Sequence, residues 1–278
     1  MTYEHFWQSL TSLYDAGEAK AVARMVLDVR FGLSLADILC GKDTQLSPKE
    51  QAEWQEIQQR LLSGEPVQYV LGLADFGPRQ FEVTPSVLIP RPETYELCQW
   101  CLSASPSDWR GSILDIGTGS GCIACTLAAE RPEASVTGWD ISPMALDVAR
   151  KNAKRANVLV SFCRQDALNP PADAAQWNLI VSNPPYICEH EQADMASWVL
   201  DHEPAQALFV PDNDPLLFYR AIAKYAQKAL KKGGRLYFEI NPYYVLPIEE
   251  TLREQGFRDI VTRKDQFGKN RFVRASWE

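Results

Sequence analysis

The first 62 residues carry apolar side chains at helical spacing. In AKAVARMVLDVRFGL (19–33), and again around Trp54, Ile57 and Leu61, apolar residues recur every three or four positions, as on one face of a helix. Ser47 and Glu50 form a capping box with a proline at the first helical position between them. No strand pattern and no polar constellation suited to chemistry occur here. The chain is predicted to begin with a helical domain, residues 1–75, that packs against or recognises a partner.

The pattern changes between residues 64 and 92. GEPVQYVLG, FGPRQFEV and TPSVLIPRP contain five prolines and short stretches of alternating apolar residues. Such a stretch is typical of turns and short strands rather than helices. We expect a hairpin and linker over residues 76–92.

From residue 93 to the end, strand patterns alternate with helical ones. The predicted strands are SILDI, SVTGWD, VLVSFC, WNLIVS, RLYFEI, FRDIVT and NRFVRASW, and helical stretches such as SPMALDVARKNAKRAN lie between several of them. This alternation predicts an α/β domain, residues 93–278, with a mostly parallel seven-stranded sheet covered by helices on both faces.

Composition and charge exclude several classes of protein. Of 278 residues, 46% are hydrophobic and 23% charged, which is ordinary for a globular protein and unlike a disordered or fibrous one. No apolar run approaches the ~20 residues of a membrane helix, and no secretory signal is visible, so a cytoplasmic protein is expected. The net charge of −8 disfavours direct binding to nucleic acid. Residues 231–235, KKGGR, are the only short basic candidate, and we interpret them as a solvated helix end with a glycine cap.

Four of the seven cysteines have the spacing of a zinc site. Cys98 and Cys101 are separated from Cys122 and Cys125 by 20 residues, which formally matches a four-cysteine pattern. Both pairs lie in predicted helices rather than on tight turns, and free cysteine is a common small buried residue. We therefore predict no metal site, and no disulfide in a reducing compartment.

A glycine-rich turn follows the first strand of the α/β domain. Gly117, Gly119 and Gly121 allow a tight turn and a close approach of the backbone to a ligand. Asp140, at the end of the next strand, is placed to accept hydrogen bonds from both hydroxyls of a ribose. The G-x-G-x-G spacing differs from the dinucleotide pattern G-x-G-x-x-G. Asp115, just before the turn, would repel a pyrophosphate but favour a cationic sulfonium or ammonium, so the pattern favours S-adenosylmethionine.

Two further segments follow later strands. Asp166 is positioned either to reach an adenine amino group or merely to solvate a loop. The strand WNLIVS ends directly in Asn183-Pro184-Pro185-Tyr186. The Asn183 side-chain oxygen and the Pro184 carbonyl could each accept one hydrogen of a planar NH2 group, and Tyr186 could stack on it. Two such acceptors raise the electron density on a nitrogen whose lone pair is delocalised, and they orient that lone pair toward the methyl group of a donor. No strong base is then required.

With these motifs the sequence resembles the protein-(glutamine-N5) methyltransferases that modify peptide chain release factors. The matching stretches are GEPVQYVLG (64–72), LIPRPET (88–94), ILDIGTGSG (113–121), VSNPPYI (181–187), HEPAQALF (202–209) and, more loosely, DQFGKNRFV (265–273). The resemblance implies a Rossmann-like methyltransferase domain that uses S-adenosylmethionine.

The resemblance also implies roles for single residues. Those assigned to the cofactor are Gly117, Thr118, Gly119, Ser120 and Gly121 at its methionine part, Asp140 at its ribose, Asp166 and Ala167 near adenine, and also Asn183. The residues that would hold the glutamine amide are Asn183, Pro184, Pro185 and Tyr186. The chain departs from the family pattern at Ala167, where an aromatic residue is common, and at Tyr95, where a glutamate is usual.

The leading hypothesis is therefore methyl transfer to the glutamine of the Gly-Gly-Gln motif of class 1 release factors. Methylation of the exocyclic amino group of an RNA or DNA base is the alternative, and a non-catalytic scaffold is a third. We expect a monomer, because the protein substrate itself would fill the cleft.

Overall fold

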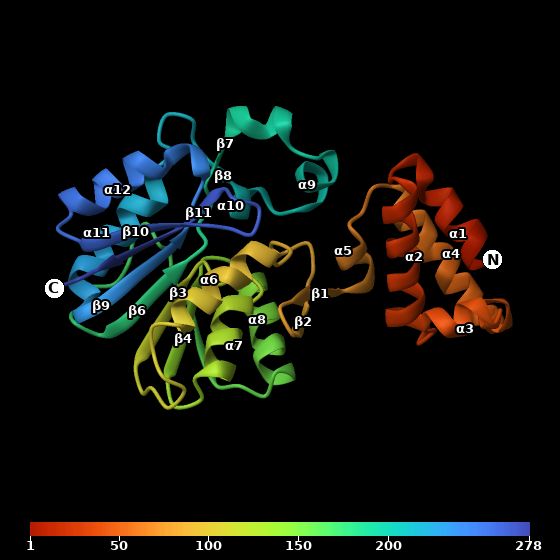
Figure 1. Cartoon of the computed structure of the whole chain (residues 1–278), viewed down its shortest axis with the longest axis horizontal. Helices are drawn as coiled ribbons and strands as arrows, with labels where there is room; N and C mark the ends of the chain where they lie inside the picture. The colour runs from red at the N-terminus through yellow and green to blue at the C-terminus, as the bar shows by residue number, and fades with distance from the viewer. The chain divides into compact units, whose positions relative to one another are not determined.

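The computed structural model describes residues 1–278, apart from the side chain of Asp194, and contains two compact units (Figure 1). The first comprises residues 1–73 together with residues 196–202, and the second comprises residues 74–195 and 203–278. None of the described helices has the length and apolar character needed to cross a membrane.

The first unit is helical, as its apolar spacing predicts. Its elements are α1 (Tyr3–Ser9), η1 (Leu10–Ser12), α2 (Ala16–Phe31), α3 (Leu35–Leu39), η2 (Lys42–Gln45), α4 (Pro48–Leu62), α5 (Val67–Leu71) and α9 (Ser197–His202). The predicted capping box is present at the start of α4, where Ser47 and Glu50 bond reciprocally. Trp54 is fully buried and meets Phe6 edge-on at 5.4 Å between ring centroids. This unit thus has a hydrophobic core of its own.

The hairpin begins earlier than predicted. Its strands are β1 (Leu73–Phe76) and β2 (Arg79–Glu82), so the expected domain boundary after residue 75 falls inside β1. The helical segment ends at Gly72, whose left-handed backbone (φ +73°) caps α5 and turns the chain directly into a strand. The local sequence shows a mixture of turn residues here, but the strand pairing decides where the hairpin starts.

The second unit is built on a seven-stranded sheet. Its strands are β3 (Ser112–Ile116), β4 (Ser135–Asp140), β5 (Val160–Arg164), β6 (Trp177–Ser182), β9 (Leu230–Glu239), β10 (Arg258–Lys264) and β11 (Asn270–Ser276). They lie in the order β10-β11-β9-β6-β3-β4-β5, and only β11 runs antiparallel to its neighbours. The mostly parallel α/β sheet predicted from the sequence is confirmed.

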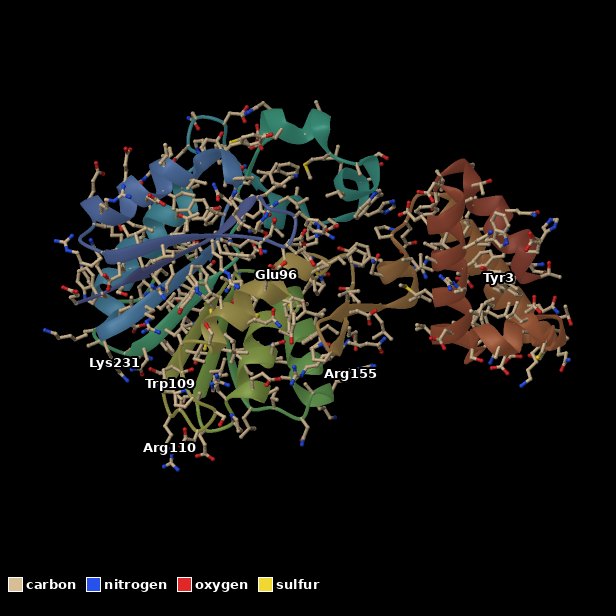
Figure 2. The ribbon with its side chains drawn as sticks, viewed as in Figure 1. Tyr3, Glu96, Trp109, Arg110, Arg155 and Lys231 are labelled. Carbon is tan, nitrogen blue, oxygen red and sulfur yellow. The ribbon has the colours of Figure 1, made fainter. Side chains whose placement is uncertain are left out.

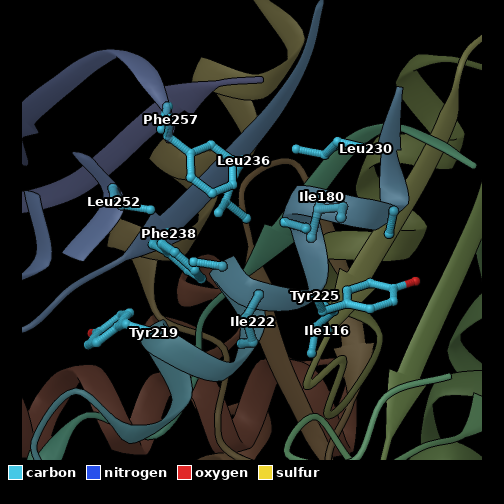
Figure 3. Close-up of a cluster of buried hydrophobic side chains, with 14 of the residues drawn as sticks. Ile116, Ile180, Tyr219, Ile222, Tyr225, Leu230, Leu236, Phe238, Leu252 and Phe257 are labelled. Carbon is cyan, nitrogen blue, oxygen red and sulfur yellow. The ribbon is translucent and has the colours of Figure 1, made fainter. Parts of the chain in front are cut away.

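Helices cover both faces of this sheet (Figure 1). α6 (Pro92–Leu102), α7 (Cys122–Glu130) and α8 (Pro143–Arg155) contribute to one core cluster, and α11 (Leu217–Ala229) and α12 (Val245–Glu254) to the other. Successive residues of β3 point to opposite faces, so Ile113 joins the first cluster and Leu114 the second. Figure 3 shows the second cluster, in which Ile180 of β6 and Ile222 of α11 both take part.

Short elements complete the unit between β6 and β9 and before α12. They are β7 (Ile187–Cys188), η3 (Glu189–Asp194), α10 (Ala205–Leu208), β8 (Phe209–Val210) and η4 (Pro242–Tyr244). β7 directly follows the Asn-Pro-Pro-Tyr segment and forms a small parallel pair with β8.

The interpretation of residues 231–235 as a helix end is wrong. α11 ends at Ala229 and β9 begins at Leu230, so the segment lies in a strand. Gly233 adopts φ +77°, and its N–H donates to the carbonyl of Trp277 at 2.7 Å. Gly233 and Gly234 therefore lie in an irregular part of a strand and do not cap a helix. Figure 2 labels Lys231 at the amino end of β9, where its Nζ donates to Oδ1 of Asn178 at 3.2 Å. This basic segment therefore lies at the amino end of β9, on the side of the sheet opposite to the carboxyl ends of the parallel strands.

The four cysteines with zinc-like spacing are buried in the core. Cys98 and Cys101 on α6 and Cys122 and Cys125 on α7 belong to the hydrophobic cluster on the first face of the sheet. Burial raises the pKa of all four thiols, which favours their neutral form. Each of these side chains contributes apolar packing there.

Candidate active site

A cavity of about 450 Å³ opens at the carboxyl ends of the parallel strands. Strand order reverses between β3 and β6, because the chain runs from β3 outward to β5 and then returns to the other side of β3. Ligands of open α/β sheets bind in the crevice outside such a reversal, and the volume falls within the range of small-molecule sites. The cavity is lined by residues 85–88, 90, 91, 94, 116–120, 122, 123, 140–142, 144, 145, 165–168, 182–185, 204, 206, 207, 218 and 222.

The glycine turn forms one wall of this cavity. Gly117 and Gly119 have φ values of +74° and +54°, and a Cβ added at either would meet no atom within 4 Å. Their backbone therefore borders open space that a side chain would fill. Gly121 is different, since its Cβ would lie 3.0 Å from the Cβ of Ala149 on α8. Two of the three predicted glycines thus face the cavity, and the third allows α7 and α8 to pack closely.

Asp115 lies beneath the turn rather than in the cavity wall. Its Oδ2 accepts hydrogen bonds from the Thr118 hydroxyl (2.6 Å) and from the Ala124 N–H (3.2 Å). Its Oδ1 is buried and has no partner among the described residues. Burial raises the pKa of Asp115 to about 7, since the charged form loses its water. In this structure the carboxyl group holds the turn and the start of α7 together.

Asp140 connects the turn to the end of β4. Its Oδ2 accepts from the Gly119 N–H and its Oδ1 from the Ser142 N–H, both at 2.9 Å. Burial raises the pKa of this carboxyl group, and the backbone donors oppose that rise. The side chain lines the cavity, so its remaining lone pairs can receive the hydroxyl groups of a ligand.

Asp166 and Ala167 also line the cavity, after β5. The carboxylate of Asp166 accepts from the Leu168 N–H (2.8 Å) and from the side chain of Asn169 (2.7 Å), so it orders its own loop. Ala167 offers no ring, but Phe218 of α11 lines the same cavity. Phe218 is an aromatic residue that the motif comparison did not identify, because its contribution depends on how α11 packs.

The Asn-Pro-Pro-Tyr segment follows β6 at the mouth of the cavity. Asn183, Pro184 and Pro185 line it, and Nδ2 of Asn183 donates to the Thr94 hydroxyl at 3.2 Å. No described residue donates to Oδ1 of Asn183. This amide therefore carries an acceptor that is free for a ligand in the cavity.

Tyr186 takes a different position from its three neighbours. It does not belong to the described lining of the cavity; its ring packs on the core cluster and its hydroxyl donates to Oε1 of Glu239 at 3.2 Å. The Tyr186 carbonyl accepts from Nδ2 of Asn241 at 3.1 Å. Stacking of Tyr186 on a substrate amide stays a prediction.

Two stretches that the sequence singled out without a chemical role meet at the cavity. Arg91, from LIPRPET, pairs with Glu203, from HEPAQALF, at 2.5 Å. The carboxylate of Glu203 is fully buried and lies 3.4 Å from the Ile89 N–H. An ion pair with one buried member fixes the relative position of its two segments, since separating the charges would leave a carboxylate unpaired. Arg91, Pro204 and Gln206 border the cavity as a result.

Comparison with known proteins agrees with this architecture. A model of the methyltransferase small domain matches residues 98–210, and a model of the PrmC N-terminal domain matches residues 7–72. A methyltransferase from Pyrococcus furiosus has a similar fold, with a TM-score of 0.51 and 16% identity over 83% of this chain and 98% of that one. These matches confirm the predicted methyltransferase fold.

Closer relatives cover nearly the whole chain. A release factor glutamine methyltransferase from Bacteroides thetaiotaomicron is 46% identical over 97% of this chain and 96% of its own length. One from Flavobacterium psychrophilum is 38% identical over 98% and 96%. The resemblance drawn from the motifs is confirmed: the chain belongs to the release factor glutamine methyltransferase family.

Proposed function

We propose that this protein methylates the side-chain amide nitrogen of the glutamine in the Gly-Gly-Gln motif of class 1 release factors. Membership of the family supports this activity. The observation that carries it is the Asn183 amide, whose Nδ2 is bonded to Thr94 while its Oδ1 is left as a free acceptor on the cavity wall. A primary amide needs such an acceptor for its N–H hydrogens.

The methyl donor is S-adenosylmethionine, which supplies an electrophilic methyl group on a sulfonium. The cavity fits it, because the backbone of Gly117 and Gly119 borders open space and Asp140 presents carboxylate oxygens at the end of β4. Asp166 and Phe218 also line the cavity, and we assign them to the base of the donor. All of these groups come from loops at the carboxyl ends of the strands or from the helices beside them.

The protein contributes position and hydrogen bonds to the reaction rather than a strong base. The nitrogen of a primary amide has a delocalised lone pair and is a weak nucleophile. Acceptance of its two hydrogens by Oδ1 of Asn183 and the carbonyl of Pro184 would raise its electron density and fix its direction. The rings of Pro184 and Pro185 restrict the backbone φ, which limits the directions that this carbonyl can take. The new carbon–nitrogen bond would form as the methyl–sulfur bond of the donor breaks, and the proton of the methylated amide, which is then acidic, would pass to solvent water.

We further propose that the protein acts as a monomer in the cytoplasm. Its partner would be the release factor itself, with no contribution from nucleic acid or membrane. The helical unit is the proposed recognition domain for the release factor.

One labelling experiment tests this function against the alternative. The protein is incubated with radiolabelled methyl donor and, separately, with whole release factor, with release factor in which the target glutamine is replaced by alanine, with transfer and ribosomal RNA, and with DNA. Label is expected only in the first sample. Label in nucleic acid alone would mean that the chain is a base methyltransferase, and label in the alanine variant would mean another target.

A further inference from the structure

A buried glutamate lies behind the Asn-Pro-Pro-Tyr segment. Glu239 is the last residue of β9 and is 2% exposed. Its Oε2 accepts from the Thr94 hydroxyl at 2.6 Å, and its Oε1 accepts from the Tyr186 hydroxyl at 3.2 Å. Glu239 does not line the cavity among the described residues, yet it is bonded to Tyr186 directly and to Asn183 through Thr94. No motif in the sequence pointed to it.

While Glu239 is ionised, the protons in this chain of hydrogen bonds can run in only one direction. An ionised carboxylate has no hydrogen, so Thr94 must donate its single hydroxyl hydrogen to Glu239. The Thr94 oxygen is then available only as an acceptor, and the group that approaches it from Asn183 must be the NH2. The orientation of the Asn183 amide is thus set by bonding logic, which leaves Oδ1 as the acceptor toward the cavity.

We propose that Glu239 and Thr94 are positioning residues that hold the Asn183 amide with its oxygen toward the substrate nitrogen. This inference rests on the proposed function, because an acceptor is needed only if the substrate presents an NH2 group. The reversed amide would present its own hydrogens to those of the substrate. Glu239 also fixes Tyr186, so one buried carboxylate orders both ends of the tetrapeptide.

Without the charge on Glu239, the hydrogen bonds that join Asn183, Thr94 and Glu239 could form with the donors in either direction. With glutamine at this position, the side-chain NH2 can donate to Thr94, and Thr94 can then donate to Oδ1 of Asn183. Protonation has the same consequence, since a carboxylic acid can also donate. Burial raises the pKa of Glu239, and the hydrogen bond from Thr94 and the charge of Arg271 oppose that rise.

The ionisable groups around Glu239 come from several elements. They are Glu93 and Cys98 on α6, Cys122 on α7, Tyr186 in the tetrapeptide, Tyr219 on α11 and Arg271 on β11. Burial raises the pKa of the two cysteines and the two tyrosines, so these four are neutral at ordinary pH. Among the described groups, Arg271 lowers the pKa of Glu239 and Glu93 raises it.

The test uses the full-length protein and four variants. Glu239→Gln adds a group that can donate to Thr94, Thr94→Val removes the link, and Thr94→Ser keeps it. Thr126→Val is the matched control, because Thr126 is a fully buried threonine on α7 whose hydroxyl has no partner among the described residues. Single-turnover rates are measured on whole release factor at saturating methyl donor across a pH series, with donor affinity measured by calorimetry.

We expect Glu239→Gln and Thr94→Val to lower the rate roughly 100-fold, the cost of a misplaced reacting group, with donor affinity changed less than about threefold. Thr94→Ser and Thr126→Val should stay within about threefold of the wild type. The wild-type rate should fall on acidification as Glu239 takes up a proton, and Glu239→Gln should lack that limb. A wild-type rate in Thr94→Val or in Glu239→Gln would overturn the inference, and so would a Thr94→Ser variant as slow as Thr94→Val.

A second readout does not depend on activity. The side-chain amide protons of Asn183, assigned by comparison with Asn183→Ala, should be protected from solvent exchange in the wild type and in Thr94→Ser, but not in Thr94→Val. Equal exchange in all of them would refute the positioning role even if no substrate were methylated. Transfer by the wild type to release factor tests the proposed function separately. The two ideas can therefore fail independently.

Discussion

Asn183 is the residue on which the proposed chemistry depends most directly. Replacement by alanine removes one of the two acceptors for the substrate amide, and loss of a preorganised hydrogen-bonding group costs roughly 10²–10³ in turnover. Asn183→Asp keeps an oxygen near the same place but cannot donate to Thr94, so we expect partial activity between alanine and wild type. Donor affinity should change little in both, because the glycine turn and Asp140 are untouched.

Single-turnover rates at saturating methyl donor distinguish these variants. Equal loss in the alanine and aspartate variants, with donor binding intact, would refute the acceptor role. A near-normal rate in Asn183→Ala would remove the tetrapeptide from the active site.

Asp115 gives a prediction about pH and stability. Its pKa is raised by burial from 3.8 to about 7, so the folded state holds the proton more tightly than the unfolded chain does. Its contribution to the free energy of unfolding is therefore full below pH 3.8 and is lost as the pH rises through about 7. Asp115→Asn should remove this loss, because the amide is neutral at every pH and its oxygen can still accept from Thr118.

Urea denaturation of the wild type and Asp115→Asn between pH 5 and about 8 checks this sign. Asp140 and Glu239 also have raised pKa values, so only the difference between the two proteins isolates Asp115. A variant whose stability falls with pH as steeply as the wild type would exclude Asp115 as the source.

At the scale of the element, two glycines of the turn between β3 and α7 have different roles. Gly119 and Gly121 both have positive φ, so alanine costs each about 1–2 kcal/mol of backbone strain. A methyl group at Gly119 enters open space on the cavity wall, whereas one at Gly121 meets Ala149 at 3.0 Å. Gly119→Ala should therefore weaken donor binding by at least about tenfold with a modest loss of stability, and Gly121→Ala should mainly lower stability.

Gly32→Ala supplies the baseline for this comparison. Gly32 caps α2 with φ +66°, and a Cβ there would meet nothing within 4 Å, so its cost is the backbone penalty alone. Chemical denaturation and calorimetric titration with the methyl donor measure both effects. The distinction fails if the two turn variants lose stability and affinity in the same proportion.

At the scale of the whole molecule, each of the two units has its own core. Trp54 is fully buried in the helical unit, and Trp54→Ala should destabilise that unit by about 3–5 kcal/mol. Because every cavity residue belongs to the other unit, donor affinity should be retained, while methylation of whole release factor should fall if the helical unit recognises it. Scanning calorimetry should show one transition lowered and the other unchanged.

Leu39→Ala is the stability control, since this side chain on α3 is 79% exposed. A single transition shifted in full by Trp54→Ala would show that the units unfold together. Loss of donor binding in Trp54→Ala would contradict the assignment of the cofactor site to the second unit alone.

The sequence by itself determined the elements and the family. Apolar periodicity placed the helices of the first unit and the strands of the sheet, and Ser47 marked the start of α4, because these signals depend on neighbours three or four residues away. The glycine turn and Asn183 could also be recognised locally, since each follows a buried strand and lies at its carboxyl end. The segment 231–235 misled for the same reason: its local pattern matched a helix end, and pairing with distant Trp277 decided otherwise.

Only the tertiary structure decided what supports the site. Glu239 lies 145 residues from Thr94, and Glu203 lies 112 from Arg91, so no local pattern could show either contact. Phe218 lines the cavity because α11 packs on the sheet. Asp115 lies beneath the turn, outside the cavity wall, because β3 is buried. The physical reason is general: spacing along the chain specifies local backbone structure, whereas the burial and pairing of a charge depend on which distant segments the fold brings together.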